Sequence, residues 1–289
     1  MQESIDVDGI TRNFTVVDGD AKGDRRRDLL LIFHGSKQTG EVHRRFTGGM
    51  FDSLADRGGA VVAYLDGYKG NWNDARRQSY FPARLENIDD VAFTRQVIHA
   101  LVASRQVDPQ RVFAVGYSNG GQMVFRLIHE APDLFAGAAV FSATLPAPDS
   151  FAVAEAGIRP IPVLLAHGTA DPIAPFEGGS MRGWAKRLFK VGGTTWSMAQ
   201  TAQYFAKRNG IAESGVDSRI SPPTSRKVWV SQTEYRPNGR PPVRAITVHG
   251  GGHTIPGPKK APFVLGRTSS DITAAQEVAS FFGLGSFAD

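Results

Sequence analysis

Short apolar runs alternate with segments of helical periodicity along most of this chain. Runs that contain no alternating polar residues are typical of strands buried on both faces of a sheet. Strands of this kind are predicted at residues 29–33, 60–65, 112–115, 136–141, 163–167, 228–230 and 244–248. Because predicted helices separate most of these strands, the pattern indicates an α/β fold with a mainly parallel central sheet and helices on both faces.

The helical periodicity predicts helices at five places: residues 51–57, a segment that begins at Asp89 and Asp90, the segment after Ser118, and residues 195–209 and 272–282. Acidic residues in a first turn, as at Asp89 and Asp90, interact favourably with the helix dipole. Gly210 directly follows the fourth helix, which is a common way for a helix to end.

The amino-terminal segment has a different pattern. Residues 4–7 and 11–17 alternate apolar and polar positions around Asp8-Gly9. Alternation of this kind around Asp-Gly is typical of an antiparallel hairpin. We therefore expect a hairpin at one edge of the sheet.

One domain over residues 1–289 is the simplest organisation, because the chain shows no low-complexity linker and no internal repeat. The segment 178–193 is the expected excursion from the fold. Trp184 and Leu188 are four residues apart within it, so it is predicted to form either a short helix over the functional site or an ordinary surface helix.

The composition, 41% hydrophobic and 21% charged in 289 residues, is ordinary for a globular protein. The net charge of +5 comes from short basic clusters without a nucleic-acid-binding motif, so we expect no nucleic-acid partner. No apolar stretch of about 20 residues is present, so no transmembrane segment is predicted. The sequence does not indicate an oligomeric state.

The chain contains no cysteine, which excludes disulfides, thiolate catalysis and cysteine-based zinc sites. No signal peptide is visible at the amino end. These two observations slightly favour a cytoplasmic location over an exported protein whose signal has been removed.

Residues 111–130 carry the strongest chemical signal. Gly116-Tyr117-Ser118-Asn119-Gly120 is a G-x-S-x-G sequence between a predicted buried strand and a predicted helix. In that context the motif forms a nucleophile elbow, a sharp turn that exposes the serine hydroxyl above the sheet. Ser118 is therefore the candidate nucleophile, and a plain strand–helix loop is the alternative.

A serine hydroxyl needs a base within hydrogen-bond reach, and the base needs an orienting acid. After a nucleophile elbow the chain order is serine, acid, histidine. Asp171 follows the predicted strand 163–167, and His253 lies in a glycine-rich loop after the last strand. Asp171 is the predicted acid, with a turn or helix cap as its alternative role. His253 is the predicted base, and His249 at the end of the strand is its rival.

The other histidines are expected to be structural or exposed. His34 and His167 end strands but precede Ser118 or Asp171 in the chain, and the remaining ones, His43, His99 and His129, lie on or near predicted helices. No pair has metal-ligand spacing, so neither a metal nor another cofactor is predicted.

A tetrahedral intermediate carries a negative oxygen that backbone N–H groups must stabilise. One donor is expected to be Asn119, the residue after the nucleophile. The second should come from the loop after the strand that ends at His34-Gly35. Ser36, or a residue next to it, is predicted to supply it.

Several segments together resemble a known group of enzymes. They are LIFHGS at 31–36, NWNDAR at 71–76, IDDVAFTRQVI at 88–98, RVFAVGYSNGGQM at 111–123, AHGTADPIAPFEGG at 166–179 and GGGHTIPG at 250–257. They resemble the polyhydroxybutyrate depolymerases and the feruloyl and acetylxylan esterases of the α/β-hydrolase superfamily. The resemblance implies the triad Ser118, Asp171 and His253, and places Trp72 and Asn73 near the substrate cleft. From its residue type alone, Trp72 is either a binding aromatic or an anchor for a long loop.

The sequence therefore predicts a serine carboxylester hydrolase that acts through an acyl-enzyme, with a small or polymeric ester as substrate. Feruloyl esters, acetyl esters and hydroxyalkanoate oligomers remain open. A peptidase or amidase with the same triad is the alternative enzyme. A catalytically dead binding protein on this fold is the alternative outside enzymes.

Overall fold

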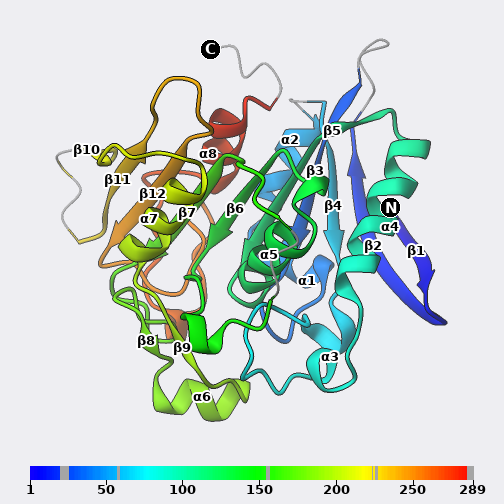
Figure 1. The fold of residues 1–289 in the computed structure, drawn as a ribbon, viewed down its shortest axis with the longest axis horizontal. Coiled ribbons are helices and arrows are strands. Elements are labelled where there is room, and N and C mark those ends of the chain that lie inside the picture. The colour runs from blue at the N-terminus through cyan, green and yellow to red at the C-terminus, as the bar shows by residue number, and fades with distance from the viewer. Residues whose placement is uncertain (20–25, 57–58, 154–156, 223, 225–226, 285–289) are drawn as a thin grey trace.

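The computed structural model describes residues 1–19, 26–56, 59–153, 157–222, 224 and 227–284. In these residues a ten-stranded sheet runs in the order β1-β2-β4-β3-β5-β6-β7-β12-β11-β10. Its strands are β1 Gln2–Val7, β2 Ile10–Asp18, β3 Arg27–Phe33, β4 Val61–Leu65, β5 Val107–Tyr117, β6 Gly137–Phe141, β7 Val163–Gly168, β10 Val216–Arg219, β11 Trp229–Tyr235 and β12 Val243–His249. Figure 1 shows the sheet twisting across the molecule.

The centre of the sheet is parallel and both edges are antiparallel. The strands β4, β3, β5, β6, β7 and β12 pair in parallel. The predicted hairpin forms β1 and β2 at one edge, and β2 joins the sheet antiparallel to β4. At the other edge β11 and β10 are also antiparallel. The parallel centre and the amino-terminal hairpin are confirmed, and the second antiparallel edge was not predicted.

Helices cover both faces of the sheet, as expected (Figure 1). Their bounds are α1 Gly40–Phe46, α2 Ser53–Asp56, α3 Pro82–Leu85, α4 Asp90–Ser104, α5 Asn119–Glu130, α6 Gly183–Phe189, α7 Met198–Arg208 and α8 Ala274–Phe282. Alternate residues of β3 show the two layers. Leu29 and Leu31 pack into the cluster that contains α4, α5 and α7, whereas Leu30 and Ile32 pack into the cluster that contains α2 and α8.

Some boundaries differ from the prediction. The helix predicted at 195–209 is Met198–Arg208, because Thr194–Thr195 forms the short strand β9. The helix predicted at 51–57 is a 3-10 turn followed by α2, and residue 57 lies outside the described residues. The elements α1, α3 and β10 were not predicted. The whole of β10 is exposed and Val216 is its one apolar residue, so it has no apolar pattern.

The segment 178–193 does leave the main sheet and contains a helix. Gly179–Ser180 forms β8, which pairs with β9, and α6 follows at the lower edge of the molecule in Figure 1. Within the described residues no helix combines the length and the apolar character needed to cross a membrane.

Candidate active site

Ser118 lies at the sharp turn between β5 and α5. Its backbone has φ 54° and ψ −113°, a conformation that L-residues seldom adopt. The turn is tight because neighbouring backbone lies very close: a Cβ on Gly116 would lie 2.3 Å from the Gly120 carbonyl oxygen, and one on Gly120 would lie 2.0 Å from that of Phe33. The two glycines of the motif are therefore a steric requirement, and the predicted elbow is present.

His253 is held in place by the backbone of its own loop. Its N–H donates to the Leu265 carbonyl at 2.7 Å, and its carbonyl accepts from the Tyr117 hydroxyl at 2.7 Å. A Cβ on Gly252 would lie 2.0 Å from the Leu265 carbonyl oxygen. The glycines before His253 thus allow close backbone packing.

Three side chains from distant parts of the polypeptide are joined by a continuous series of hydrogen bonds. His253 Nε2 lies 2.8 Å from Ser118 Oγ, and His253 Nδ1 lies 2.7 Å from Asp171 Oδ2. Ser118 is partly exposed, whereas His253 and Asp171 are 4% and 2% exposed. With the tautomer that donates from Nδ1 to the carboxylate, Nε2 is free to accept the serine proton.

The Asp171 carboxylate is buried among hydrogen-bond donors. Burial alone would raise its pKa, but the adjacent His253 imidazole and the backbone N–H of Ile173 more than offset this effect, so the pKa of Asp171 lies below its ordinary value. Its Oδ1 accepts from the N–H groups of Ile173 at 2.7 Å and Ala174 at 2.9 Å. The carboxylate therefore stays ionised and can stabilise an imidazolium at His253.

The other histidines have separate surroundings. The rival His249 stacks on Trp229 with 3.5 Å between ring centroids and contacts Ser231 Oγ, on the β11 side of β12. His34 and His167 are fully buried next to backbone carbonyls of their own loops, and burial lowers the pKa of both. The described residues contain no group of three or more potential metal ligands.

Neither of the two predicted oxyanion donors makes a hydrogen bond within the described residues. Gly35 N–H donates to Gln38 Oε1 and Lys37 N–H donates to the Gly70 carbonyl. Between them, Ser36 N–H makes no hydrogen bond within the described chain, and neither does Asn119 N–H at the start of α5. The arrangement leaves one free donor in each of the two places where the sequence predicts one.

Trp72 and Asn73, which the resemblance places near the substrate cleft, are 0% and 1% exposed. Neither residue lines the cavity that contains Ser118. Trp72 Nε1 donates to the His34 carbonyl at 2.9 Å, and its backbone N–H donates to Asn119 Oδ1 at 3.0 Å. Asn73 N–H donates to Asp90 Oδ2 at 2.7 Å. The side chains of Trp72 and Asn73 therefore do not face the cavity, and Trp72 anchors its loop.

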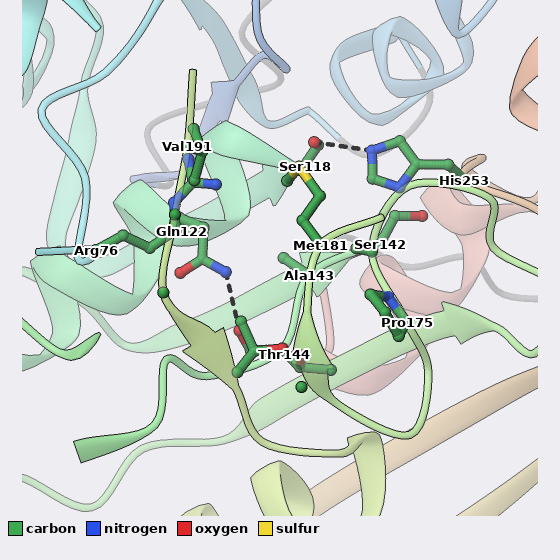
Figure 2. Close-up of a pocket in the computed structure, with 15 residues that line it drawn as sticks. Arg76, Ser118, Gln122, Ser142, Ala143, Thr144, Pro175, Met181, Val191 and His253 are labelled. Atoms are coloured by element: carbon green, nitrogen blue, oxygen red, sulfur yellow. Dashed lines mark hydrogen bonds between the residues drawn. The ribbon is translucent and has the colours of Figure 1, made fainter. Parts of the chain in front are cut away.

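The cavity in front of Ser118 lies at the carboxyl ends of the parallel strands. Its lining also comes from the segments after β6 and β7 and from the excursion, and is formed by Arg76, Ser118, Gln122, Ser142, Ala143, Thr144, Ala174, Pro175, Gly179, Met181, Val191, Gly192, Gly193, Thr195 and His253. Figure 2 shows Met181 and Val191 close to Ser118 in this view. Helix α6 itself does not line the cavity, but the segments that lead into and out of it do.

Sequence analysis did not single out Arg76, Gln122, Met181 or Val191. Gln122 had a usable signal, because it lies in the first turn of the helix predicted directly after Ser118 and is therefore close to the nucleophile. The residues of the excursion had none, because their position depends on how a loop folds back over the sheet.

A parallel sheet with a serine at a strand–helix elbow, followed along the chain by an aspartate and a histidine that converge on it, defines the α/β-hydrolase class. The family model described as phospholipase/carboxylesterase matches residues 71–194. The structure is similar to the acetyl xylan esterase from Aspergillus awamori, with a TM-score of 0.65 at 13% identity over 99% of this chain and 100% of that one. At that identity the similarity concerns the fold.

Two relatives of known name indicate which group within the α/β-hydrolases the chain belongs to. The putative esterase NocK of Nocardia uniformis subsp. tsuyamanensis is 34% identical over 264 residues, which are 88% of this chain and 74% of that protein. Feruloyl esterase B of Piromyces equi is 27% identical over 239 residues, 80% of this chain but 40% of that protein. The chain belongs to the esterase group of the α/β-hydrolases that includes feruloyl and acetylxylan esterases and polyhydroxybutyrate depolymerases, and is a serine ester hydrolase.

Proposed function

We propose that the chain hydrolyses carboxylic esters through an acyl-enzyme on Ser118, with His253 as the base and Asp171 as the acid of the triad. The observation that carries this assignment is the continuous hydrogen-bonded chain Ser118 Oγ–His253 Nε2 and His253 Nδ1–Asp171 Oδ2, at 2.8 and 2.7 Å. Ser118 is the one member of the three that is partly exposed, so a substrate can reach it.

The geometry suits both halves of the reaction. Ser118 Oγ attacks the ester carbonyl while His253 Nε2 takes its proton, and the same proton then goes to the leaving alkoxide. Water attacks the acyl-enzyme in the second half with His253 again as base, which releases the acid and restores Ser118. Asp171 keeps the imidazole in the required tautomer and stabilises its protonated form.

The negative oxygen of the tetrahedral intermediate is proposed to bind between the N–H groups of Asn119 and Ser36. Asn119 N–H lies at the amino end of α5, where the helix dipole also favours negative charge. One such donor is typically worth about 3 kcal/mol of transition-state stabilisation. No cofactor takes part in this reaction scheme.

The substrate is an ester of the kinds that the relatives' names describe: feruloyl, acetyl or hydroxyalkanoate. Feruloyl esterase B and the acetyl xylan esterase are named for the first two, and a poly(3-hydroxybutyrate) depolymerase of Ralstonia pickettii, 34% identical over 122 residues, for the third. A panel of matched esters of the three kinds would rank them by kcat/KM.

Ser118→Ala tests the assignment. Loss of the nucleophile is expected to lower kcat for p-nitrophenyl acetate by at least about 10⁴-fold, as in other serine hydrolases. A fluorophosphonate probe should label the parent protein at Ser118 and leave the variant unlabelled. Parent-like turnover by a folded Ser118→Ala protein would refute the proposal.

A further inference from the structure

Two polar side chains on one wall of the cavity have no part in the reaction scheme. Arg76 and Gln122 are 7% and 4% exposed, and both line the cavity that contains Ser118. Figure 2 shows them together on the side of Ser118 that faces away from His253. Convergent polar groups in such a cavity commonly set the orientation and specificity of a ligand.

Gln122 presents an unpaired acceptor. Its Nε2 donates to the Thr144 carbonyl at 2.8 Å, and this bond fixes which end of the amide is the oxygen. The remaining Oε1 is buried and accepts no hydrogen bond from the described part of the chain. An unsatisfied buried acceptor is unfavourable, so a ligand group that donates a hydrogen bond would be bound well here.

Arg76 presents a donor on the same wall of the cavity. Its Nε and Nη2 donate to the Asp74 carboxylate, which is fully buried. Its Nη1 makes no hydrogen bond within the described chain and remains available. Asp74 offsets the charge of this guanidinium, so Nη1 can donate to a neutral oxygen as well as to an anion.

The position of this wall decides which part of the ester it meets. His253 must lie next to the leaving oxygen in order to protonate it, so the alcohol part leaves on that side. The acyl part then extends toward Arg76 and Gln122. Gln122 lies in the first turn of α5, just after Ser118, and both side chains line the same cavity. A group within a few bonds of the acyl carbonyl is therefore the part of the substrate that lies closest to this pair.

We propose that Arg76 and Gln122 are specificity-determining residues that select short acyl groups with a hydroxyl on one of the first two carbons beyond the carbonyl. That hydroxyl donates to Gln122 Oε1 and accepts from Arg76 Nη1. The proposal rests on the function proposed above. An acetyl group has no such hydroxyl, and the phenol of a feruloyl group lies at the far end of a rigid ring, beyond this pair.

The test compares p-nitrophenyl esters of butyrate, 2-hydroxybutyrate and 3-hydroxybutyrate, with each kcat/KM divided by that ester's rate of hydrolysis by hydroxide. The quantity to compare is the ratio of this normalised kcat/KM for a hydroxy ester to that for the butyrate ester. In the parent protein we expect this ratio to be about ten for at least one of the two hydroxy esters. Gln122→Met keeps the length of the side chain but removes the acceptor, and should bring the ratio to about one. Trp184→Ala changes a half-exposed residue of α6, which does not line the cavity, and should leave the ratio as it is.

A ratio near one in the parent protein, or an unchanged ratio in Gln122→Met, would overturn the proposal. The ratio does not depend on the fraction of folded enzyme, so partial misfolding does not obscure it. Should Gln122→Met fail to fold, Arg76→Lys keeps a cation beside Asp74 and is expected to lower the same ratio. Activity that persists in Ser118→Ala would refute the triad assignment, whereas a failed ratio with an inactive Ser118→Ala refutes the specificity proposal alone.

Discussion

Two tryptophans near the cavity lie in regions of opposite character. Trp72 belongs to the buried loop 71–76 and is 0% exposed, whereas Trp184 belongs to α6 in the excursion 178–193 and is 50% exposed. Both segments contribute residues to the cavity, Arg76 from the loop and Met181 from the excursion. One wall of the site is therefore part of the protein core, and the other is a surface segment laid over it.

The loop 71–76 and the excursion 178–193 differ in their hydrogen-bond partners. The loop is tied to distant elements: Asn73 N–H donates to Asp90, which also pairs with Arg12 at 2.7 Å, and Trp72 bonds to Asn119. The excursion is joined to the rest mainly by short backbone bridges, such as Ser79 with Val191. The network of the loop includes Asn119, next to the nucleophile, and so helps to preserve the geometry of the chemistry.

Trp72→Ala should give the largest effect on stability. It removes a fully buried indole and leaves the His34 carbonyl without its donor, so we expect the free energy of unfolding to fall by about 3–5 kcal/mol. Chemical denaturation followed by circular dichroism would measure this. A cost below about 1 kcal/mol would mean that the loop is not part of the core, and the contrast between the two walls would disappear.

Low pH should also destabilise the buried side of the site, where His34 contacts the loop that contains Trp72. His34 Nε2 accepts from Gly67 N–H at 2.8 Å and so must be neutral, and burial lowers the pKa of His34 from 6.5 to about 4. Because the unfolded state binds a proton that the folded state does not, His34 supports folding fully above pH 6.5, and this support is lost as the pH falls toward 4. At about 1.4 kcal/mol per pKa unit, the loss amounts to about 3 kcal/mol.

The free energy of unfolding, measured between pH 7.5 and pH 4, would show this decline. His43, whose pKa burial lowers to about 3, adds to it, so the difference between the parent protein and His34→Gln isolates the contribution of His34. That difference should shrink steadily as the pH falls from 6.5. A difference that is constant over this range would show that His34 is not held neutral in the folded state.

The contrast also explains what could be predicted from sequence. Ser118, Asp171 and His253 each follow an apolar strand, and the carboxyl ends of parallel strands share one edge, so local pattern was enough to bring them together. The burial of Trp72 could not be predicted in the same way. It depends on partners such as His34 and Asn119, which are 38 and 47 residues away in the chain.

The elements that were missed lack the pattern on which prediction depends. Strand β10 is exposed throughout, and α1 contains several charged residues and buries only Gly40 and His43. The excursion was predicted to contain a helix from Trp184 and Leu188, and it does. Its contribution to the cavity comes from the flanking Met181 and Val191, whose positions follow from the path of the chain rather than from periodicity.

Trp184→Ala should give the smallest effect and is the matched control for Trp72→Ala. Half of the Trp184 side chain is already exposed and α6 does not line the cavity, so the free energy of unfolding should change by no more than about 0.5 kcal/mol. Turnover of p-nitrophenyl acetate should stay within about twofold of the parent rate. The same denaturation and kinetic measurements apply to both variants. If the two alanine substitutions cost the same stability, the excursion is as firmly packed as the loop, and the distinction between a core wall and a surface wall of this site is wrong.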